Sequence, residues 1–201
     1  LTEILSSCFS RGIHRLIIPS IAPSNWQQVL NLVESHKVPL QGTSISEVKA
    51  PLLYPCLGIH PWFLQDLSLN DLEQLSVQVE RHKDKIIAIG ETGIDGGIVK
   101  QQNNLSQQQT FFSYQIDLAT QHNLPLIVHH RQSHQEIVAI LKAKKSTCGG
   151  IIHAFSGSYQ QAKEYIDLGF SLGIGGTITY PRAKKTINTI KRLPLTSLVL
   201  E

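Results

Sequence analysis

The sequence contains no methionine, and it has few cysteines, charged residues and aromatic residues. Its three cysteines, Cys8, Cys56 and Cys148, lie far apart without a CxxC pair, which argues against a disulfide scaffold and favours a reducing compartment. No apolar run approaches the length of a membrane span, and no signal-peptide pattern opens the chain. We therefore expect a cytoplasmic protein without membrane association and, because Met is absent, a first residue that is not a translation start.

The sequence has a low fraction of charged residues and a small net charge. Charged residues make up 16% of the 201 residues and hydrophobic residues 41%, which allows a sizeable core and argues against wholesale disorder. A net charge of +3, from 18 basic and 15 acidic residues, permits a polyanionic partner. A dedicated nucleic-acid-binding module is usually far more basic. We expect a monomer with a single domain over residues 1–201.

Short apolar segments alternate with amphipathic segments along the whole chain. Strands are predicted over residues 14–20, 54–61, 86–91, 124–130, 149–155, 170–176 and 197–201. Helices are predicted over residues 2–12, 24–36, 70–83, 106–123, 133–146, 158–170 and 181–193. Strands that are apolar throughout and separated by helices are typical of a parallel sheet covered by helices.

Doubly wound sheets and (β/α)8 barrels both have this pattern. No GxGxxG motif follows the first predicted strand, which disfavours a dinucleotide-binding fold. We therefore predict an α/β fold of the (β/α)8 TIM-barrel type. A typical barrel has about 250 residues, so the chain would lack the first strand and the last helix, and its domain would be incomplete at both ends. The connections 41–51 and 96–106 are predicted to be loops.

Five of the predicted strands end in a side chain that can bind a metal ion: His60, Glu91, His129, His153 and Glu201. In parallel α/β folds the catalytic groups project from the C-terminal ends of strands, and a barrel gathers those ends on one face. Taken singly, each residue could be structural, and Glu91 could pair with Arg131. Taken together, imidazoles and a carboxylate form a set that suits a divalent transition metal. Glu91 could bridge two ions, whose charge would offset its own.

The other histidines are weaker candidates. Strand alternation turns His130 away from the face of His129, so we interpret it as a packing residue or as one that supports a metal ligand from behind. His134 falls in the following helix or its first turn. The remaining ones, His14, His36, His82 and His122, are interpreted as surface residues.

Polar loops on the same face could bind an anion. Ser156 and Gly157 precede a predicted helix and could hold an anionic oxygen, although an N-cap by Ser156 or Ser158 would explain the same residues. Arg131 and Arg182 could bind phosphate, although an exposed arginine usually only interacts with solvent.

Five motifs resemble the TatD-type metal-dependent hydrolases. In chain order they are GIHP, IGETGID, LPLIVHHR, HAFSGS and GGTITYPRAKKT, and the last is similar to the YjjV-like branch. The resemblance covers essentially the whole chain. It implies a (β/α)8 barrel with two divalent metal ions and deoxyribonuclease activity. It also implies that Glu91 bridges the ions, that His129 and His153 bind the second ion, and that His60 lies on the substrate side.

Two further features of the family would lie outside this sequence. Its HxH pair would precede Leu1, and the aspartate expected to act as general base would come two residues after Glu201. Both features hold the first ion.

The resulting hypothesis is a two-metal phosphodiesterase that acts on DNA or an oligonucleotide, with Zn, Mg or Mn as the ions. In such enzymes two ions about 3.5–4 Å apart activate a water and stabilise the leaving oxygen. Glu91 and His60 are the predicted catalytic residues. The predicted substrate-binding residues are His60, Arg131, Ser156, Gly157 and Arg182.

Two alternatives stay open at this stage. Hydrolysis of a C–N or ester bond of the amidohydrolase type would be favoured by a carbamylated lysine at the fourth strand end, where this sequence has His129. A non-catalytic truncated barrel that binds nucleic acid or a partner would hold less than one metal ion per chain.

Overall fold

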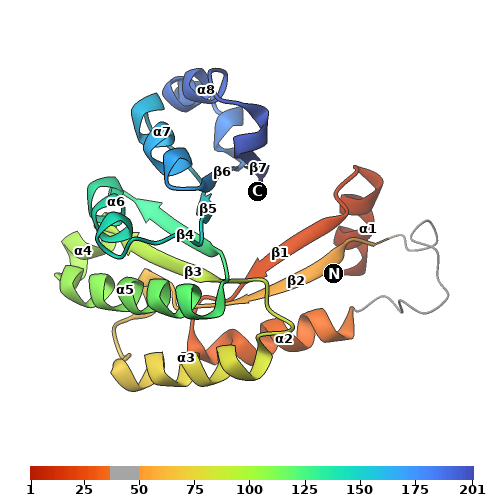
Figure 1. Ribbon diagram of the computed structural model, residues 1–201. Coiled ribbons are helices and arrows are strands. Elements are labelled where there is room, and N and C mark those ends of the chain that lie inside the picture. Colours follow the sequence, from red (N-terminus) through yellow and green to blue (C-terminus); the bar gives the residue numbers. More distant parts are fainter. Residues whose placement is uncertain (37–49) are drawn as a thin grey trace.

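The computed structural model describes residues 1–36 and 50–201, and its central element is one parallel sheet. Its strands are β1 (Arg15–Pro19), β2 (Leu52–Leu57), β3 (Ala88–Asp95), β4 (Leu126–Arg131), β5 (Gly150–His153), β6 (Phe170–Ile174) and β7 (Leu198–Leu200). They pair in chain order, each parallel to the next. The sheet curls from β1 round to β7, with helices along its outer side (Figure 1). This confirms the predicted TIM-barrel class.

The described residues form eight α-helices, one more than predicted. They are α1 (Thr2–Ser10), α2 (Trp26–Ser35), α3 (Leu69–His82), α4 (Gly96–Gln102), α5 (Leu105–His122), α6 (His134–Ala143), α7 (Tyr159–Asp167) and α8 (Lys184–Ile190). Short 3-10 turns include η3 (Pro61–Phe63), η4 (Gly176–Thr179) and η5 (Pro181–Ala183). None of the helices in the described part of the chain is long and apolar enough to cross a membrane.

Successive strand residues face opposite sides of the sheet, and both sides are apolar. On the outer side, a large core joins the strands to the helices, with Leu57, Ile89, Val128 and Ile152 packed among residues such as Leu72 and Leu75 of α3. On the inner side, Cys56, Ala88 and Ile127 form a separate buried group, called the inner cluster below. The polar residues of the site lie on the same inner side, farther along the strands.

Two predicted strand boundaries are wrong in ways that affect the site. The strand predicted over residues 54–61 ends at Leu57, so His60 lies in the connection that follows β2. The strand predicted to end at Glu91 continues to Asp95, with a register irregularity between Gly90 and Thr92 opposite β4. Glu91 therefore lies within a strand, at the point where the pairing with β4 shifts.

Helix α4 fills most of a predicted loop. Asp95 caps this helix, because its Oδ1 accepts hydrogen bonds from the N–H groups of Gly97 and Ile98 at 2.7 and 2.9 Å. The connector predicted over residues 41–51 lies almost entirely outside the described residues.

Candidate metal centre

Glu91 lies at the centre of a buried polar cluster. Its Oε1 is 3.2 Å from Nδ1 of His129 and 3.4 Å from Nε2 of His60. Ligand atoms of these three side chains all lie within 4.8 Å of one another. Glu91 is only 7% exposed. Burial alone would raise the pKa of Glu91, but hydrogen bonds with His129 and His60 offset burial and hold that pKa below its ordinary value.

The backbone brings β2 and β3 unusually close beneath this cluster. A Cβ atom on Gly58 would lie 2.5 Å from the carbonyl carbon of Gly90, so only a residue without a side chain fits there. The N–H of His60 donates to the carbonyl of Ile21 at 2.9 Å, which fixes the connection after β2 against the connection after β1. These contacts place His60 beside Glu91 although neither is at a strand end.

His60 is oriented by the turn that it begins. Its Nδ1 accepts a hydrogen bond from the backbone N–H of Trp62 at 3.1 Å, so the proton of the neutral ring lies on Nε2. Burial lowers the pKa of His60 by more than the nearby carboxylates raise it. A neutral His60 therefore directs an N–H group toward Glu91 and suits a hydrogen-bond donor better than a metal ligand.

Asp95 holds His129 from the other side. Oδ2 of Asp95 lies 2.9 Å from Nε2 of His129 and accepts a hydrogen bond from Nε1 of Trp62 at 2.7 Å. Burial would raise the pKa of this fully buried carboxyl group, but the hydrogen bonds from Trp62 and His129 hold it below its ordinary value. Asp95 is therefore an ionised acceptor, and the proton of a neutral His129 lies on Nε2.

When His129 is neutral, this tautomer leaves the lone pair of its Nδ1 facing Oε1 of Glu91, 3.2 Å away, and a hydrogen bond between the two atoms requires a second ring proton. Two acceptors at this separation repel each other unless a proton or a cation is shared between them. Metal-binding histidines commonly donate their other N–H to a carboxylate, as His129 does to Asp95. The donor set of Glu91 and His129 therefore fits a divalent cation.

His153 stands beside this cluster with a different partner. It lies next to His129 in the register of β4 and β5. Its Nδ1 is 2.9 Å from Oε1 of Glu201, and its side chain is 38% exposed. The hydrogen bond with Glu201 raises the pKa of His153, and the charge of Glu91 adds to this effect. Of the predicted ligands, the structure thus brings Glu91 and His129 together and leaves His153 paired with Glu201.

The two predicted phosphate-binding arginines have partners of their own. Nη1 of Arg131 lies 3.8 Å from Oδ2 of Asp95, and the side chain is 53% exposed. The guanidinium of Arg182 lies 5.1 Å from the ring centroid of Tyr180. Both groups remain open to solvent, Arg131 as the last residue of β4 and Arg182 in η5, which follows β6 in the chain.

The residues predicted to hold an anion, Ser156 and Gly157, directly precede an ordinary helix cap at the start of α7. Ser158 is the N-cap, and its Oγ accepts from the N–H of Gln161 at 3.3 Å. Ser156 is exposed, and the carbonyl of Gly157 accepts from Oγ1 of Thr189 at 3.1 Å. Nothing in this geometry requires an anion, although Ser156 and Gly157 follow His153 by only three and four residues in the chain.

The other histidines divide between packing and the surface. His130 faces outward, as strand alternation predicts, and its ring stacks on Phe155 at 5.6 Å between centroids. His134 begins α6 and bonds through Nε2 to Oε2 of Glu164 at 2.8 Å. The prediction of a surface position is confirmed for His14 and wrong for His122, whose side chain is mostly buried; His36 and His82 are half-buried.

Asp95 and Trp62 are the residues that sequence reasoning missed. An aspartate between an apolar strand and a Gly-Gly pair is a helix N-cap signal, which could have drawn attention to Asp95. No local signal shows that the indole of Trp62 reaches the same carboxylate.

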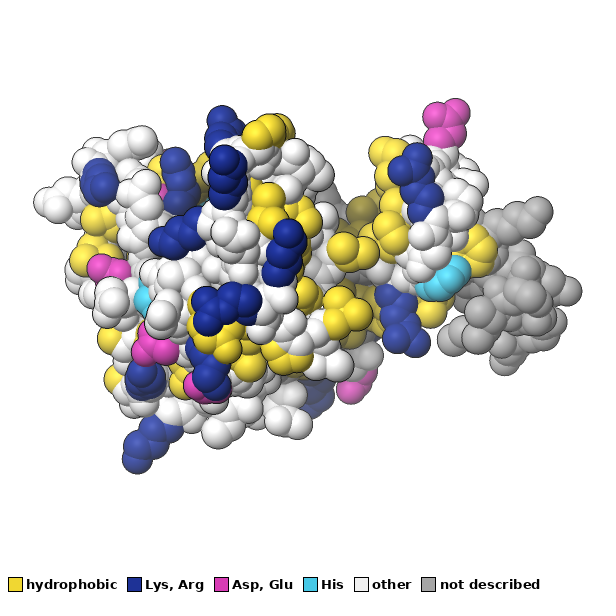
Figure 2. Space-filling view, turned by 90° about the horizontal axis from the view of Figure 1, so that it is seen from above, with side chains coloured by type: hydrophobic (Ala, Val, Ile, Leu, Met, Phe, Trp, Pro, Cys, Tyr) yellow, Lys and Arg dark blue, Asp and Glu magenta, His cyan; other side chains and the backbone are white. Residues whose placement is uncertain are grey.

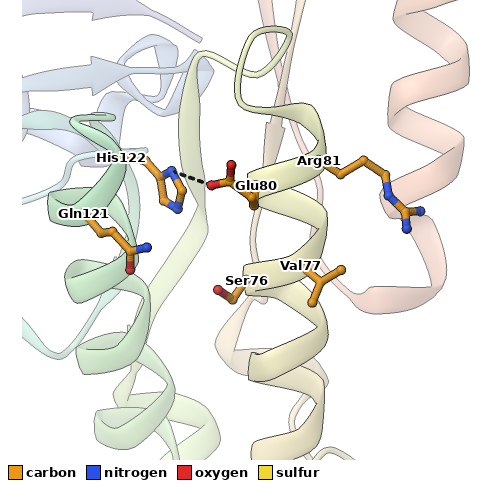
Figure 3. A pocket seen from close by; sticks show the side chains of 6 residues that line it. All are labelled: Ser76, Val77, Glu80, Arg81, Gln121 and His122. Carbon is orange, nitrogen blue, oxygen red and sulfur yellow. Dashed lines mark ion pairs between the residues drawn. The ribbon is translucent and has the colours of Figure 1, made fainter.

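A surface hollow lies away from the cluster around Glu91. A hollow of about 380 Å³ between α3 and α5 is lined by Ser76, Val77, Glu80, Arg81, Gln121 and His122 (Figure 3). An ion pair between Nδ1 of His122 and Oε2 of Glu80, at 3.8 Å, spans it. The C-terminal ends of these helices lead into the N-terminal ends of β3 and β4, so the hollow lies at the opposite end of the barrel from His129.

A curled parallel sheet of the TIM-barrel type, covered by helices outside and with histidines and a carboxylate inside, has the architecture of the metal-dependent hydrolases. The sequence matches the family described as TatD related DNase over residues 1–201, and the chain belongs to this family.

Relatives agree in sequence and in fold. YjjV of Escherichia coli, described as an uncharacterized metal-dependent hydrolase, is 38% identical over 190 residues, which cover 94% of this chain and 67% of YjjV. An uncharacterized metal-dependent hydrolase of Haemophilus influenzae is 42% identical over 147 residues, covering 72% of this chain and 56% of that protein. The crystal structure of YjjV matches all of this chain and 71% of its own with a TM-score of 0.84 at 37% identity. The chain spans only part of each relative.

Proposed function

We propose that this protein hydrolyses phosphodiester bonds in DNA with two divalent metal ions. The observation that carries the proposal is the approach of two acceptors, Oε1 of Glu91 and Nδ1 of His129, with Asp95 fixing the proton on the far side of the imidazole. When bound, these ions would supply an activated water and would offset the negative charge that develops on the leaving oxygen. The family name supports DNA as the substrate.

Each residue of the cluster has a distinct part in this proposal. Glu91 would bridge the ions through its two carboxylate oxygens, and His129 would contribute Nδ1. His153, which lies next to His129 in the register of β4 and β5, would be the further ligand. His60 stays neutral and donates its Nε2–H to a phosphate oxygen, which agrees with its tautomer.

A basic stretch near the end of the sequence supports a polyanionic substrate. Between Asp167 and Glu201 the sequence has no acidic residue, and its basic residues are Arg182, Lys184, Lys185, Lys191 and Arg192. Figure 2 shows Lys and Arg side chains spread over the larger part of the molecule, with few acidic side chains between them. We assign substrate contacts to Arg131, Ser156, Gly157 and Arg182 as well as to His60. Binding that depends on phosphate contacts weakens steeply with salt.

The test is the variant Glu91→Ala in the intact protein, assayed for cleavage of single-stranded and double-stranded DNA with Mg²⁺, Mn²⁺ or Zn²⁺. We expect cleavage to fall by about a thousandfold, because removing one group that stabilises the transition state already costs about 10²–10³. Bound metal per chain, measured by mass spectrometry, falls in the same variant.

Glu73→Ala, which removes an exposed carboxylate of α3, is the matched control and keeps full activity. Cleavage that persists in Glu91→Ala would rule out the bridging role. A wild-type protein that hydrolyses amide or ester substrates but no DNA would favour the amidohydrolase alternative. A wild-type protein without turnover and with less than one metal ion per chain would favour the binding alternative.

A further inference from the structure

Two large aromatic side chains are half exposed beside the candidate metal centre. Trp62 is 46% exposed and Phe63 is 43% exposed, and both belong to η3, directly after His60. Large aromatic side chains are usually well covered, and adjoining exposed ones commonly mark a binding site. We call Trp62 and Phe63 the aromatic shelf.

The indole ring of the shelf is fixed against the site. Nε1 of Trp62 donates to Oδ2 of Asp95 at 2.7 Å. The ring packs edge to face with His60, at 5.6 Å and 87°, and with His129, at 6.2 Å and 72°. The ring of Phe63 lies 5.9 Å from that of His60. Because its polar edge is tied down, the indole cannot turn away, and its free surface stays in solvent next to the partners of Glu91.

The hydrogen bond to Asp95 does not by itself account for the shelf, because Phe63 has no polar atom and yet stands open to solvent. Exposed aromatics also gather at this end of the fold. Among the described residues, the exposed large aromatic side chains are Trp62, Phe63 and Tyr180, and they lie in connections that follow β2 and β6. In barrels of this type, such connections form the substrate site.

We propose that the aromatic shelf is a stacking site for the nucleobase next to the scissile phosphodiester, and that the substrate is therefore an unpaired strand. This inference rests on the proposed function and names its substrate class. An aromatic ring can stack on any of the bases, whereas a base inside a duplex is already covered by its neighbours on both sides. The shelf therefore accepts single-stranded DNA or a frayed end and has little preference for sequence.

Two substitutions of one residue separate stacking from the hydrogen bond. Trp62→Phe and Trp62→Leu both remove the donor to Asp95, but only Trp62→Phe keeps an aromatic face. On single-stranded DNA we expect KM in Trp62→Leu to exceed KM in Trp62→Phe by roughly 5- to 150-fold, the range measured for loss of one stacked base. On an oligonucleotide with abasic sites in place of its bases, the two variants behave alike. Phe63→Leu, which leaves Trp62 and its hydrogen bond in place, has a smaller effect in the same direction.

Leu195→Ala is the control, since Leu195 is a strongly exposed apolar residue of another connection. It leaves KM unchanged on both substrates. If KM rises equally in Trp62→Phe and Trp62→Leu on both substrates, the stacking proposal is wrong, because the role of Trp62 would then lie only in its hydrogen bond. In that case DNA cleavage by the wild type would still support the proposed function.

Fluorescence tests the shelf without turnover. The chain has two tryptophans, and Trp26 is buried, so a stacked base quenches Trp62 alone. A thymidine phosphorothioate dodecamer, which resists cleavage, is titrated into the protein with Mg²⁺ present. We expect saturable quenching in the wild type and none in Trp62→Phe. If the wild type cleaves DNA but its fluorescence is not quenched, the stacking proposal is wrong. If its fluorescence is quenched but it cleaves no DNA, the stacking site is supported and the proposed function is wrong.

Discussion

His129 and His130 are neighbours on β4, and they lie on opposite faces of the sheet in very different surroundings. On the inner face, both ring nitrogens of His129 face carboxylates, Glu91 at 3.2 Å and Asp95 at 2.9 Å. On the outer face, both ring nitrogens of His130 are buried, and neither has a hydrogen-bond partner among the described residues. The ring of His130 packs instead against Phe155 and Tyr165.

The electrostatic consequences are opposite. Burial lowers the pKa of His130 to about 4, so the outer ring is neutral at pH 7. Around His129, hydrogen bonds keep the pKa values of Glu91 and Asp95 below their ordinary values despite burial. The inner face therefore favours a positive charge and the outer face excludes one. The comparison teaches that the neighbours of a histidine, more than its presence at a strand end, decide whether it can serve a metal ion.

The outer cluster is large enough to be mistaken for a second site. His134 lies 4.9 Å from Tyr165 between ring centroids, and Nδ1 of His134 and the hydroxyl of Tyr165 also have no hydrogen-bond partner within the described residues. Yet in residues 1–36 and 50–201 the side chains whose potential ligand atoms lie close together belong to His60, Glu91 and His129, beside the inner face, and among them Glu91 and His129 suit a metal ion. We interpret the outer cluster as packing.

Among the variants that test the difference between the two faces, Asp95→Asn should have the largest effect, which is a loss of metal affinity on the inner face. The amide can turn its NH₂ group toward Nε2 of His129, which would place the ring proton on Nδ1 and block the proposed ligand position. Asparagine caps helices as well as aspartate does, so α4 is retained. Loss of a carboxylate behind a metal-binding histidine costs about 10- to 100-fold in affinity, and we expect a loss of this size in calorimetric titrations with Mn²⁺ or Zn²⁺.

The control for this prediction is Asp117→Asn, which changes an exposed carboxylate of α5 that pairs with Lys144. It should leave metal affinity untouched. If Asp95→Asn binds metal as tightly as the wild type, Asp95 serves only to cap α4. The inference that Asp95 orients the imidazole of His129 for metal binding would then be wrong.

A smaller effect is expected on the outer face from His130→Leu. A buried polar atom without a partner costs about 1–3 kcal/mol, and a leucine can pack against Phe155 and Tyr165 without that cost. We expect the variant to be more stable by about 1 kcal/mol, which raises Tm by about 2–4 °C in a chain of this size. Metal affinity stays at the wild-type level. Thermal unfolding followed by circular dichroism measures the first effect and calorimetric titration the second.

His129→Leu is the matched variant on the inner face, and it should lose metal binding. A fall of several degrees in Tm for His130→Leu would mean that the ring nitrogens of His130 do have polar partners. The surroundings of His130 would then resemble those of His129 more closely than the contacts of the described residues indicate.

The order and direction of the strands could be predicted because both faces of the sheet are covered. Ile127 and Ile151 face the inside and Val128 and Ile152 the outside, so the strands are apolar throughout and stand out from the helical pattern. Strand ends were harder to predict, because Ile59 is fully buried although it lies beyond β2. Helix α4 was missed because its first residues are Gly96 and Gly97, which have low helix propensity.

The site was predictable only in part. Strand alternation separates His129 from His130, and the apolar run before Glu91 marks a buried carboxylate. The pairing of Asp95 with His129 depends on the register irregularity between Gly90 and Thr92, which no local pattern predicts. Sequence likewise gives no measure of side-chain exposure, so the aromatic shelf and the pairing of His153 with Glu201 emerge only from the three-dimensional structure.

The smallest expected effect concerns the inner cluster of Cys56, Ala88 and Ile127, which lies below the metal centre. Burial raises the pKa of Cys56 from 9.0 to about 12. The thiol of the unfolded chain ionises near its ordinary value, while the thiol of the folded chain keeps its proton. Above about pH 9 the unfolded state therefore binds fewer protons than the folded state, and the free energy of unfolding falls as pH rises.

Because half of the unfolded thiol is ionised at pH 9, the stability contributed by Cys56 should fall by about half a kcal/mol between pH 7 and pH 9. Urea unfolding of the wild type and of Cys56→Ala at both pH values isolates this contribution, since all other titrating groups are common to the two proteins. We expect the stability advantage of the wild type to shrink by that amount at pH 9. An advantage that is the same at both pH values would mean that the folded thiol ionises as readily as the unfolded one. Water would then reach the inner cluster, and the apolar layer that keeps Glu91 in a partly dry site would be missing.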